Sequence, residues 1–285
     1  MPTLTFMKAQ LEKVFGEVDS KIAKTVSQVM ALIMLRGGFN IWPNLLQFLT
    51  GNLLKECFGT DLATNAQNLE IVENSIHTIA IIVEDCSKQF EDEKFRSVVT
   101  DMFPPICKLI STNYNEAIVQ NAINTINMLL LTNTDIILQS MDEYLGVLLS
   151  IGLQIDQGGK NSKVKWRVVQ GITTIMEIQM TSVISQFQRV QDLMYGALMH
   201  KDQQVALAAS EFWSGINNTK LDENDEIRVS KIENSMEQIL PALLECCVMQ
   251  NVDRMGDMPS KESDIAHVEA KGNEDEDDDD DGESE

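Results

Sequence analysis

Apolar side chains recur three and four residues apart through most of the chain before residue 250, which is the spacing of helices with one buried face. The pattern is clearest in the stretches FMKAQLEKVF, SKIAKTVSQVMALIML and IWPNLLQFLTGNLLKECF. Glycine and proline, which interrupt helices, number only 15 and 6 among 285 residues. We therefore predict an all-α fold and exclude a β-sandwich.

Five of the predicted helices share a pattern in which a polar loop is followed by an aliphatic residue, here called the anchor, and by a small or β-branched residue four positions later. The anchors are Ile22, Ile71, Ile118, Val164 and Val205. Their spacings of 49, 47, 46 and 41 residues match the period of HEAT and armadillo arrays. Two helices per unit favour HEAT over armadillo, which uses three. The sequence thus predicts a HEAT-repeat α-solenoid, a superhelix of antiparallel helix pairs.

The predicted array occupies residues 1–250, and residues 251–285 are predicted to form a disordered acidic tail that has too few bulky apolar residues to fold. The helix pairs are predicted at about 4–36, 43–88, 92–131, 134–178 and 182–218, followed by an unpaired helix at 226–249.

Tryptophans and prolines add local expectations within this array. Trp42, Trp166 and Trp213 are expected to wedge between neighbouring pairs, with Trp213 partly exposed. Pro43 is expected in the first turn of its helix. The proline pair at 104–105, like Pro241, either lies near a helix start or kinks a helix already begun.

The formal net charge is −22, and residues 253–285 alone hold 15 acids and 3 bases. This excess of acid argues against binding to nucleic acid and favours basic protein partners. The tail is either a solubilising segment or an electrostatic lure for a basic ligand. We find no apolar run long enough for a membrane span and no signal peptide, so we expect an intracellular protein without a membrane partner.

Signals of catalysis are weak. The five cysteines lack the spacing of a zinc site, and His77, His200 and His267 lie far apart in the sequence. Motifs for a phosphate cradle, a dinucleotide or a nucleophilic serine are absent from the sequence. We predict no catalytic residue, no cofactor and no metal, buried reduced thiols, and a structural role for His77.

Several segments, in this order, resemble the transportin branch, or karyopherin beta two, of the importin-beta family of nuclear transport receptors: IWPNLL, SIHTIAIIVEDCSKQ, MDEYLGVLLSIG, KVKWRVVQGITTIME, DQQVALAASEFWSGI and QILPALLECCVMQ. The most specific is DQQVALAASEFWSGI, which is similar to ENVALEACEFWLTL of that family. The resemblance covers about residues 15–250, roughly the third to eighth HEAT repeats, and implies that the chain ends within the family's acidic loop.

This resemblance implies a nuclear import receptor segment that moves between cytoplasm and nucleus. In the family, N-terminal repeats bind the GTPase Ran in its GTP form, an acidic loop couples Ran binding to cargo release, and C-terminal repeats hold cargo with basic or proline-tyrosine localisation signals. Nucleoporins are further expected partners. The alternative is an acid-tailed chaperone or scaffold for basic proteins that works without nucleotide dependence.

Acids on the second helix of each pair are the candidate contacts to basic patches of Ran, since these helices generally line the concave face of such arrays. They are Glu73, Glu84, Asp85, Glu177 and Glu211. By position, the coupling role of the acidic loop would fall to Glu274, Asp275, Glu276, Asp277, Asp278, Asp279, Asp280 and Asp281. Each of these acids is otherwise an ordinary solvated side chain.

Overall fold

The computed structural model describes residues 2–15, 20–58, 66–111, 115–132, 135–155, 161–218 and 226–256. Throughout these residues the regular secondary structure is helical, which confirms the all-α prediction, and the architecture is a HEAT/armadillo-like repeat solenoid. The chain divides into two compact units, Met1–Ala242 and Leu243–Glu285. The first, here called unit 1, holds nearly all of the described helices.

The helices of the described residues follow one another with short connections. They are α1 (Pro2–Val14), α2 (Ser20–Gly37), α3 (Leu45–Phe58), α4 (Ala66–Cys86), α5 (Arg96–Ser111), α6 (Glu116–Leu130), α7 (Asp135–Gln139), α8 (Met141–Gln154), α9 (Ser162–Ile178), α10 (Met180–Ser185), α11 (Phe187–Leu198), α12 (Gln203–Asn218) and α13 (Glu226–Gly256), with short 3-10 turns η1 (Ser87–Glu91) and η2 (Glu93–Phe95) between α4 and α5.

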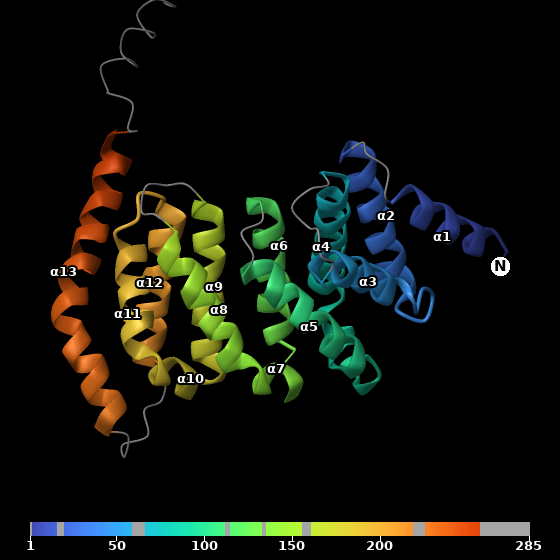
Figure 1. Cartoon of the computed structure of the whole chain (residues 1–285). Coiled ribbons are helices and arrows are strands. Elements are labelled where there is room, and N and C mark those ends of the chain that lie inside the picture. Colours follow the sequence, from blue (N-terminus) through green and yellow to red (C-terminus); the bar gives the residue numbers. More distant parts are fainter. Residues whose placement is uncertain are drawn as a thin grey trace, which may run out of the picture. The chain divides into compact units, whose positions relative to one another are not determined.

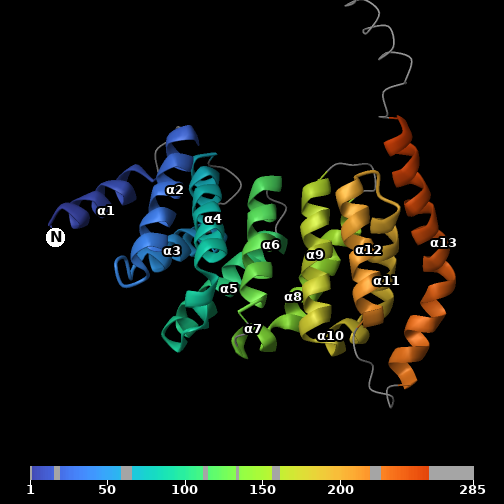
Figure 2. The same cartoon turned by 180° about the vertical axis from the view of Figure 1, so that it is seen from behind.

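Two layers build unit 1. Helices α2, α4, α6, α9 and α12 pack each against the next and form what we call the second-helix row, which stands upright in Figures 1 and 2. Helices α3, α5, α8 and α11 form the other layer, and each packs on its following partner in the row. Because one helix pair cannot cover its own apolar stripe, the core lies between successive pairs.

The small residues that follow the anchors lie inside this row. Val26, Ser75, Ala122, Val168 and Ala209 are all buried. Their side chains are short, so adjacent helices approach closely, as the repeat pattern predicts. The anchors themselves are buried on α6, α9 and α12, whereas Ile22 on α2 is 46% exposed because α2 begins the row.

A buried polar contact and a glycine join three helices at the centre of unit 1. The hydroxyl of Tyr144, fully buried on α8, donates to Oδ1 of Asn127 on α6 at 2.7 Å. Nδ2 of Asn127 donates to the carbonyl of Arg167 on α9 at 3.0 Å. A Cβ at Gly171 of α9 would stand 2.4 Å from Oδ1 of Asn127 and 2.9 Å from Cδ1 of Leu148. Only a residue without a side chain fits there.

Three local expectations about aromatic and proline residues need correction or refinement. Trp213 is 1% exposed, so its expected partial exposure is wrong; its ring lies in the core beside that of Phe212. Pro43 lies in the turn before α3, not in its first turn. Pro104, Pro105 and Pro241 lie inside α5 and α13 and not near their first turns.

The last described helix ends later than predicted. Helix α13 runs to Gly256, beyond the predicted helix end at 249, and unit 1 ends within this helix at Ala242. The predicted disordered tail is outside the described residues from residue 257 onward.

We predict that alanine has opposite effects at two helical glycines. Gly171→Ala should lower the free energy of unfolding by about 1–3 kcal/mol, since its methyl group overlaps Asn127 and Leu148. Gly146→Ala on α8 should raise it by roughly 0.5–1 kcal/mol, because the site has no atom within 4 Å and alanine favours helix. Urea unfolding followed by circular dichroism measures both, and equal effects would contradict the close approach at Gly171.

Candidate protein-binding face

The solvent side of the second-helix row carries the folded candidate acids. Glu73, Glu84 and Asp85 come from α4, Glu177 from α9, and Glu211 from α12. All are exposed except Glu73, which is half-buried and accepts a hydrogen bond from Nδ2 of Asn115 at 3.0 Å. The candidate tail acids Glu274–Asp281 lie outside the described residues.

These acids do not converge on one point. Neighbouring packed helices lie about 8–10 Å apart, so α4 and α12, three steps apart in the row, are separated by roughly 25–30 Å. Along α4 itself, the 12 residues from Glu73 to Asp85 rise about 18 Å. Such a spread suits a macromolecular partner and not a small substrate.

The repeat register brings corresponding residues of different helices into two lines across this face. Two positions after the anchors stand Lys24, Glu73, Gln120, Trp166 and Leu207. Six positions after the anchors stand Gln28, His77, Asn124, Gln170 and Glu211. The first line is exposed or half-buried throughout, and so is the second apart from Asn124. A partner lying across the row would therefore meet one residue of each line from every pair.

Arg167 on α9 is a cation near the middle of this face, whereas the candidate residues predicted from the sequence are all acids. Its guanidinium lies 4.4 Å from the ring centre of Trp166 and donates to Oε1 of Gln170 at 3.2 Å. Partial burial lowers the pKa of Arg167, and the charge of Glu84 on α4 opposes that shift. The repeat spacing could have indicated that Arg167 lies near this face, because Arg167 comes three residues after the anchor Val164.

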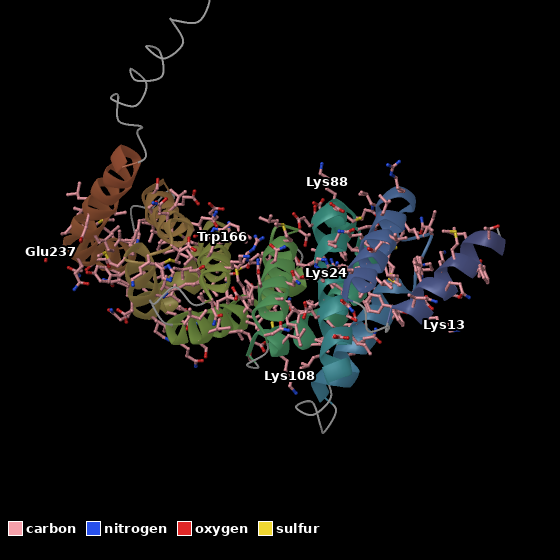
Figure 3. All side chains as sticks on the ribbon, turned by 90° about the horizontal axis from the view of Figure 1, so that it is seen from above. Lys13, Lys24, Lys88, Lys108, Trp166 and Glu237 are labelled. Carbon is pink, nitrogen blue, oxygen red and sulfur yellow. The ribbon has the colours of Figure 1, made fainter. Side chains whose placement is uncertain are left out.

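Two polar atoms near the middle of the row are buried without a hydrogen-bond partner in the described part of the chain: Nε of Arg167 and Oδ1 of Asn124. Asn124 is 7% exposed. A buried unpaired polar atom costs about 1–3 kcal/mol of stability. Figure 3 shows Trp166 and Lys88 on one side of unit 1 and Lys108 of α5 on the opposite side.

The described cysteines have the burial and the pKa expected of structural side chains. Cys86 and Cys107 are free and buried, and burial raises the pKa of Cys107 to about 12, far from that of a reactive thiolate. The side chains of Cys57, Cys246 and Cys247 are outside the described set. Within the described residues, His, Cys, Asp and Glu side chains form no group of three that could hold a metal ion.

None of the described helices combines the length and the apolar composition that a membrane-spanning helix needs.

His200 is buried in the turn between α11 and α12, where its Nδ1 accepts a hydrogen bond from the backbone N–H of Asp202 at 3.1 Å. This bond requires an unprotonated Nδ1. Burial and then the charge of Lys165 lower the pKa of His200, while Asp202 acts in the opposite direction. On α4, burial and then Lys24 likewise lower the pKa of His77.

No family model matches the chain. Among curated proteins, it is similar to Transportin of Dictyostelium discoideum, with 21% identity over 212 residues, 74% of this chain and 21% of that protein. It is similar to Transportin-1 of Mus musculus with 21% identity over 208 residues, 73% of this chain and 21% of that protein. Importin subunit beta-2 of Schizosaccharomyces pombe is 20% identical over 280 residues, 95% of this chain and 28% of that protein.

The chain therefore spans between about a fifth and somewhat more than a quarter of the length of the curated relatives it matches. Among solved structures, a designed armadillo repeat protein in complex with the peptide (KR)4 aligns with a TM-score of 0.48 and 15% identity, over 83% of this chain and 90% of that chain.

We predict that stability falls as the pH drops from 7.5 to 5.5. Since the pKa values of His200 and His77 lie below the ordinary 6.5 when folded, the unfolded chain binds protons first, and stability present above pH 6.5 is lost on acidification. Each histidine can contribute a slope of at most about 1.4 kcal/mol per pH unit.

Denaturant unfolding at several pH values measures this slope. His200→Gln keeps an acceptor for the N–H of Asp202 but cannot take up a proton, so the slope should become shallower. An unchanged slope in both His200→Gln and His77→Gln would contradict the assignment.

Proposed function

We propose that this chain acts in nuclear transport as a receptor segment of the transportin type, which binds Ran in its GTP form and moves between cytoplasm and nucleus. Cargo with basic or proline-tyrosine localisation signals, and nucleoporins, are its other proposed partners. The mechanism involves no bond chemistry. It is competition between ligands for one helical array, in which each ligand changes the affinity for the other.

The similarity to the two transportins and the importin subunit beta-2, which extends over 73% to 95% of this chain, carries the proposal. The exposed acids of the second-helix row support it, because a spread of solvated carboxylates attracts a basic protein surface and speeds association. Since the relatives are several times longer, the proposal concerns binding by this segment and not a complete transport cycle.

The charge of the C-terminal stretch favours a second candidate function, a chaperone or scaffold for basic proteins without nucleotide dependence. Residues 253–285 hold 15 acids and 3 bases, and such a segment binds many basic surfaces in a salt-sensitive way. Removal of residues 257–285 should abolish binding under this second function. Under the first, binding to Ran should keep its nucleotide preference after the removal.

We expect the full chain to bind Ran loaded with GTP at least about tenfold more tightly than Ran loaded with GDP. Isothermal titration calorimetry at two salt concentrations measures both affinities. Equal affinity for the two nucleotide states, or no binding by a folded helical sample, would contradict the proposal.

A pair of charge-matched triple variants tests the face. Glu84→Gln, Glu177→Gln and Glu211→Gln together should weaken binding of the GTP form by roughly 10–100-fold, since each removes one exposed attraction of about 0.5–1 kcal/mol. The control is Asp101→Asn, Asp142→Asn and Glu143→Gln on α5 and α8, which removes the same charge from exposed residues of the other layer. Equal losses in both triples would indicate a response to net charge alone.

A further inference from the structure

Helix α2 exposes more large apolar side chains than any other described helix of unit 1. They are Ile22, Leu32 and Leu35, of which Leu32 is 50% exposed. The anchors of α6, α9 and α12 are buried beneath the preceding helix of the row, and α2 has no such neighbour in the described part of the chain. This end of unit 1 is therefore built like an internal contact of the array but faces the solvent.

The charge of α2 is the reverse of the charge of the whole chain. The formal net charge is −22, yet α2 holds Lys21, Lys24 and Arg36 and no acid. Lys21, Leu32 and Arg36 are exposed and lie along one line of the helix, because 11 and 15 residues correspond to about three and four turns. With Thr25, which lies on the same line, they form what we call the α2 stripe. It is a leucine between two cations.

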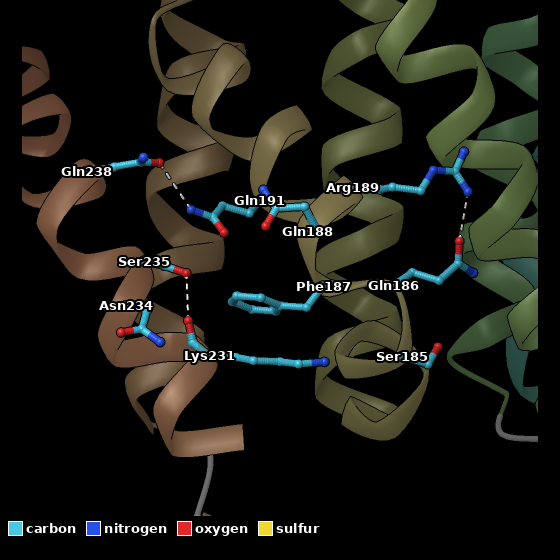
Figure 4. A pocket seen from close by; sticks show the side chains of 10 residues that line it. All are labelled: Ser185, Gln186, Phe187, Gln188, Arg189, Gln191, Lys231, Asn234, Ser235 and Gln238. Atoms are coloured by element: carbon cyan, nitrogen blue, oxygen red, sulfur yellow. Dashed lines mark hydrogen bonds between the residues drawn. The ribbon is translucent and has the colours of Figure 1, made fainter. Parts of the chain in front are cut away.

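Helix α13 lies at the other end of unit 1, with one side turned toward α10 and α11. Nζ of Lys231 donates to the carbonyl of Ile184 at 3.1 Å, and Oε1 of Gln238 accepts from Nε2 of a glutamine on α11 at 3.3 Å (Figure 4). Ile232 and Ile239, the next residues in the sequence, are buried. These contacts fix the rotation of α13 and so determine which of its sides faces the solvent.

The solvent side of α13 carries Glu233, Glu237 and Leu240, here called the α13 stripe. All three are exposed, Leu240 to 53%. They are four and three residues apart and therefore lie along one line of the helix. Figure 3 shows Glu237 at the α13 end of unit 1 and Lys13 of α1 toward the opposite end. The two ends of the unit thus present opposite charges beside an exposed leucine.

The two stripes complement each other in either direction of packing. Each stripe has one leucine, and the two leucines can meet at the centre of a contact. If the helices are antiparallel, Arg36 then lies within one turn of Glu237. If they are parallel, Lys21 lies about one turn from Glu233. Opposite charges beside an apolar contact favour this pairing over the contact of two like stripes.

The two stripes of one molecule cannot meet, because α4, α6, α9 and α12 lie between α2 and α13 (Figures 1 and 2). Four steps of about 8–10 Å separate α2 from α12 alone. Every copy of the chain carries both stripes, so the complement of each stripe is present on a second copy.

We propose that copies of this chain associate head to tail, with the α2 stripe of one copy packed on the α13 stripe of the next. The contact is heterologous, so each added copy brings a further stripe and the association continues beyond a dimer. A contact between two helices buries less than the standard interface of about 1,600 Å², so the association is weak. The stripes share no residue with the candidate acids of the second-helix row. The inference therefore does not rest on the proposed transport function.

Sedimentation velocity of the full chain between about 1 and 300 µM tests the association, since this range covers weak contacts. We expect the weight-average sedimentation coefficient to rise with concentration. Between about 0.05 and 0.5 M salt the association should weaken at least about threefold, because exposed charges are screened. A monomer at every concentration, or an association that salt does not weaken, overturns the proposal.

Charge reversal tests the pairing of the stripes. Lys21→Glu with Arg36→Glu places acids on both stripes, and Glu233→Lys with Glu237→Lys places cations on both. Each double variant alone should associate at least about tenfold more weakly than the unaltered chain, since like charges then meet. An equimolar mixture of the two should recover the association, because each altered stripe finds its complement on the other variant. A mixture that stays monomeric overturns the pairing.

The matched control is Lys88→Glu with Lys163→Glu, which changes the net charge as much as the first double variant at exposed residues outside both stripes. It should change the association less than about twofold. A loss equal to that of the first double variant would show a response to net charge alone and overturn the assignment.

Exposed leucines beside cations also occur on helices that bind an anionic lipid surface. Flotation with vesicles that contain phosphatidylserine tests that occupant, and we expect none. Flotation of a chain that is monomeric in solution, abolished by Lys21→Glu with Arg36→Glu, overturns the head-to-tail pairing. The triple variant at Glu84, Glu177 and Glu211 alters neither stripe and should associate like the unaltered chain, so this test and that of the transport function fail independently.

Discussion

Close packing between successive second helices is the constraint on which the rest of unit 1 depends. Each helix pair leaves an apolar face that only the next pair can cover, and the cover is tight only where short side chains let the helices approach. Ser75, Ala122 and Ala209 occupy these contacts in three helices of the row. Gly171 does the same between α9, α6 and α8, where a single methyl group would overlap its neighbours.

This packing also determines what the solvent side of the row looks like. Since the repeat fixes the rotation of each helix, the same positions of every repeat reach the surface and form lines that cross the row. Helix α9, which carries Trp166, Arg167 and Gln170, packs on α6, which carries Asn124, and Arg167 lies within electrostatic reach of Glu84 on α4. A binding face of this kind is distributed over many helices, which suits a large partner and explains why no compact cluster of acids forms.

Helix α13 joins its neighbours in unit 1 through both apolar and polar side chains. Ile232, Ile239 and Ala242 are buried along one face of α13. Hydrogen bonds from Lys231 to the carbonyl of Ile184 and from Gln191 to Gln238 add to this packing.

The sequence by itself determined the helical class and the solenoid architecture, because hydrophobic period and repeat spacing are local properties of the chain. It also indicated which residues after each anchor would be buried. It did not determine the exposure of Ile22, the burial of Trp213, or the end of α13, since each depends on whether a neighbouring helix covers that position. The burial of Nε of Arg167 and of Oδ1 of Asn124 without a hydrogen-bond partner became recognisable only in three dimensions. A site made of side chains from separate helices has no signature along the chain, and only the tertiary structure brings its parts together.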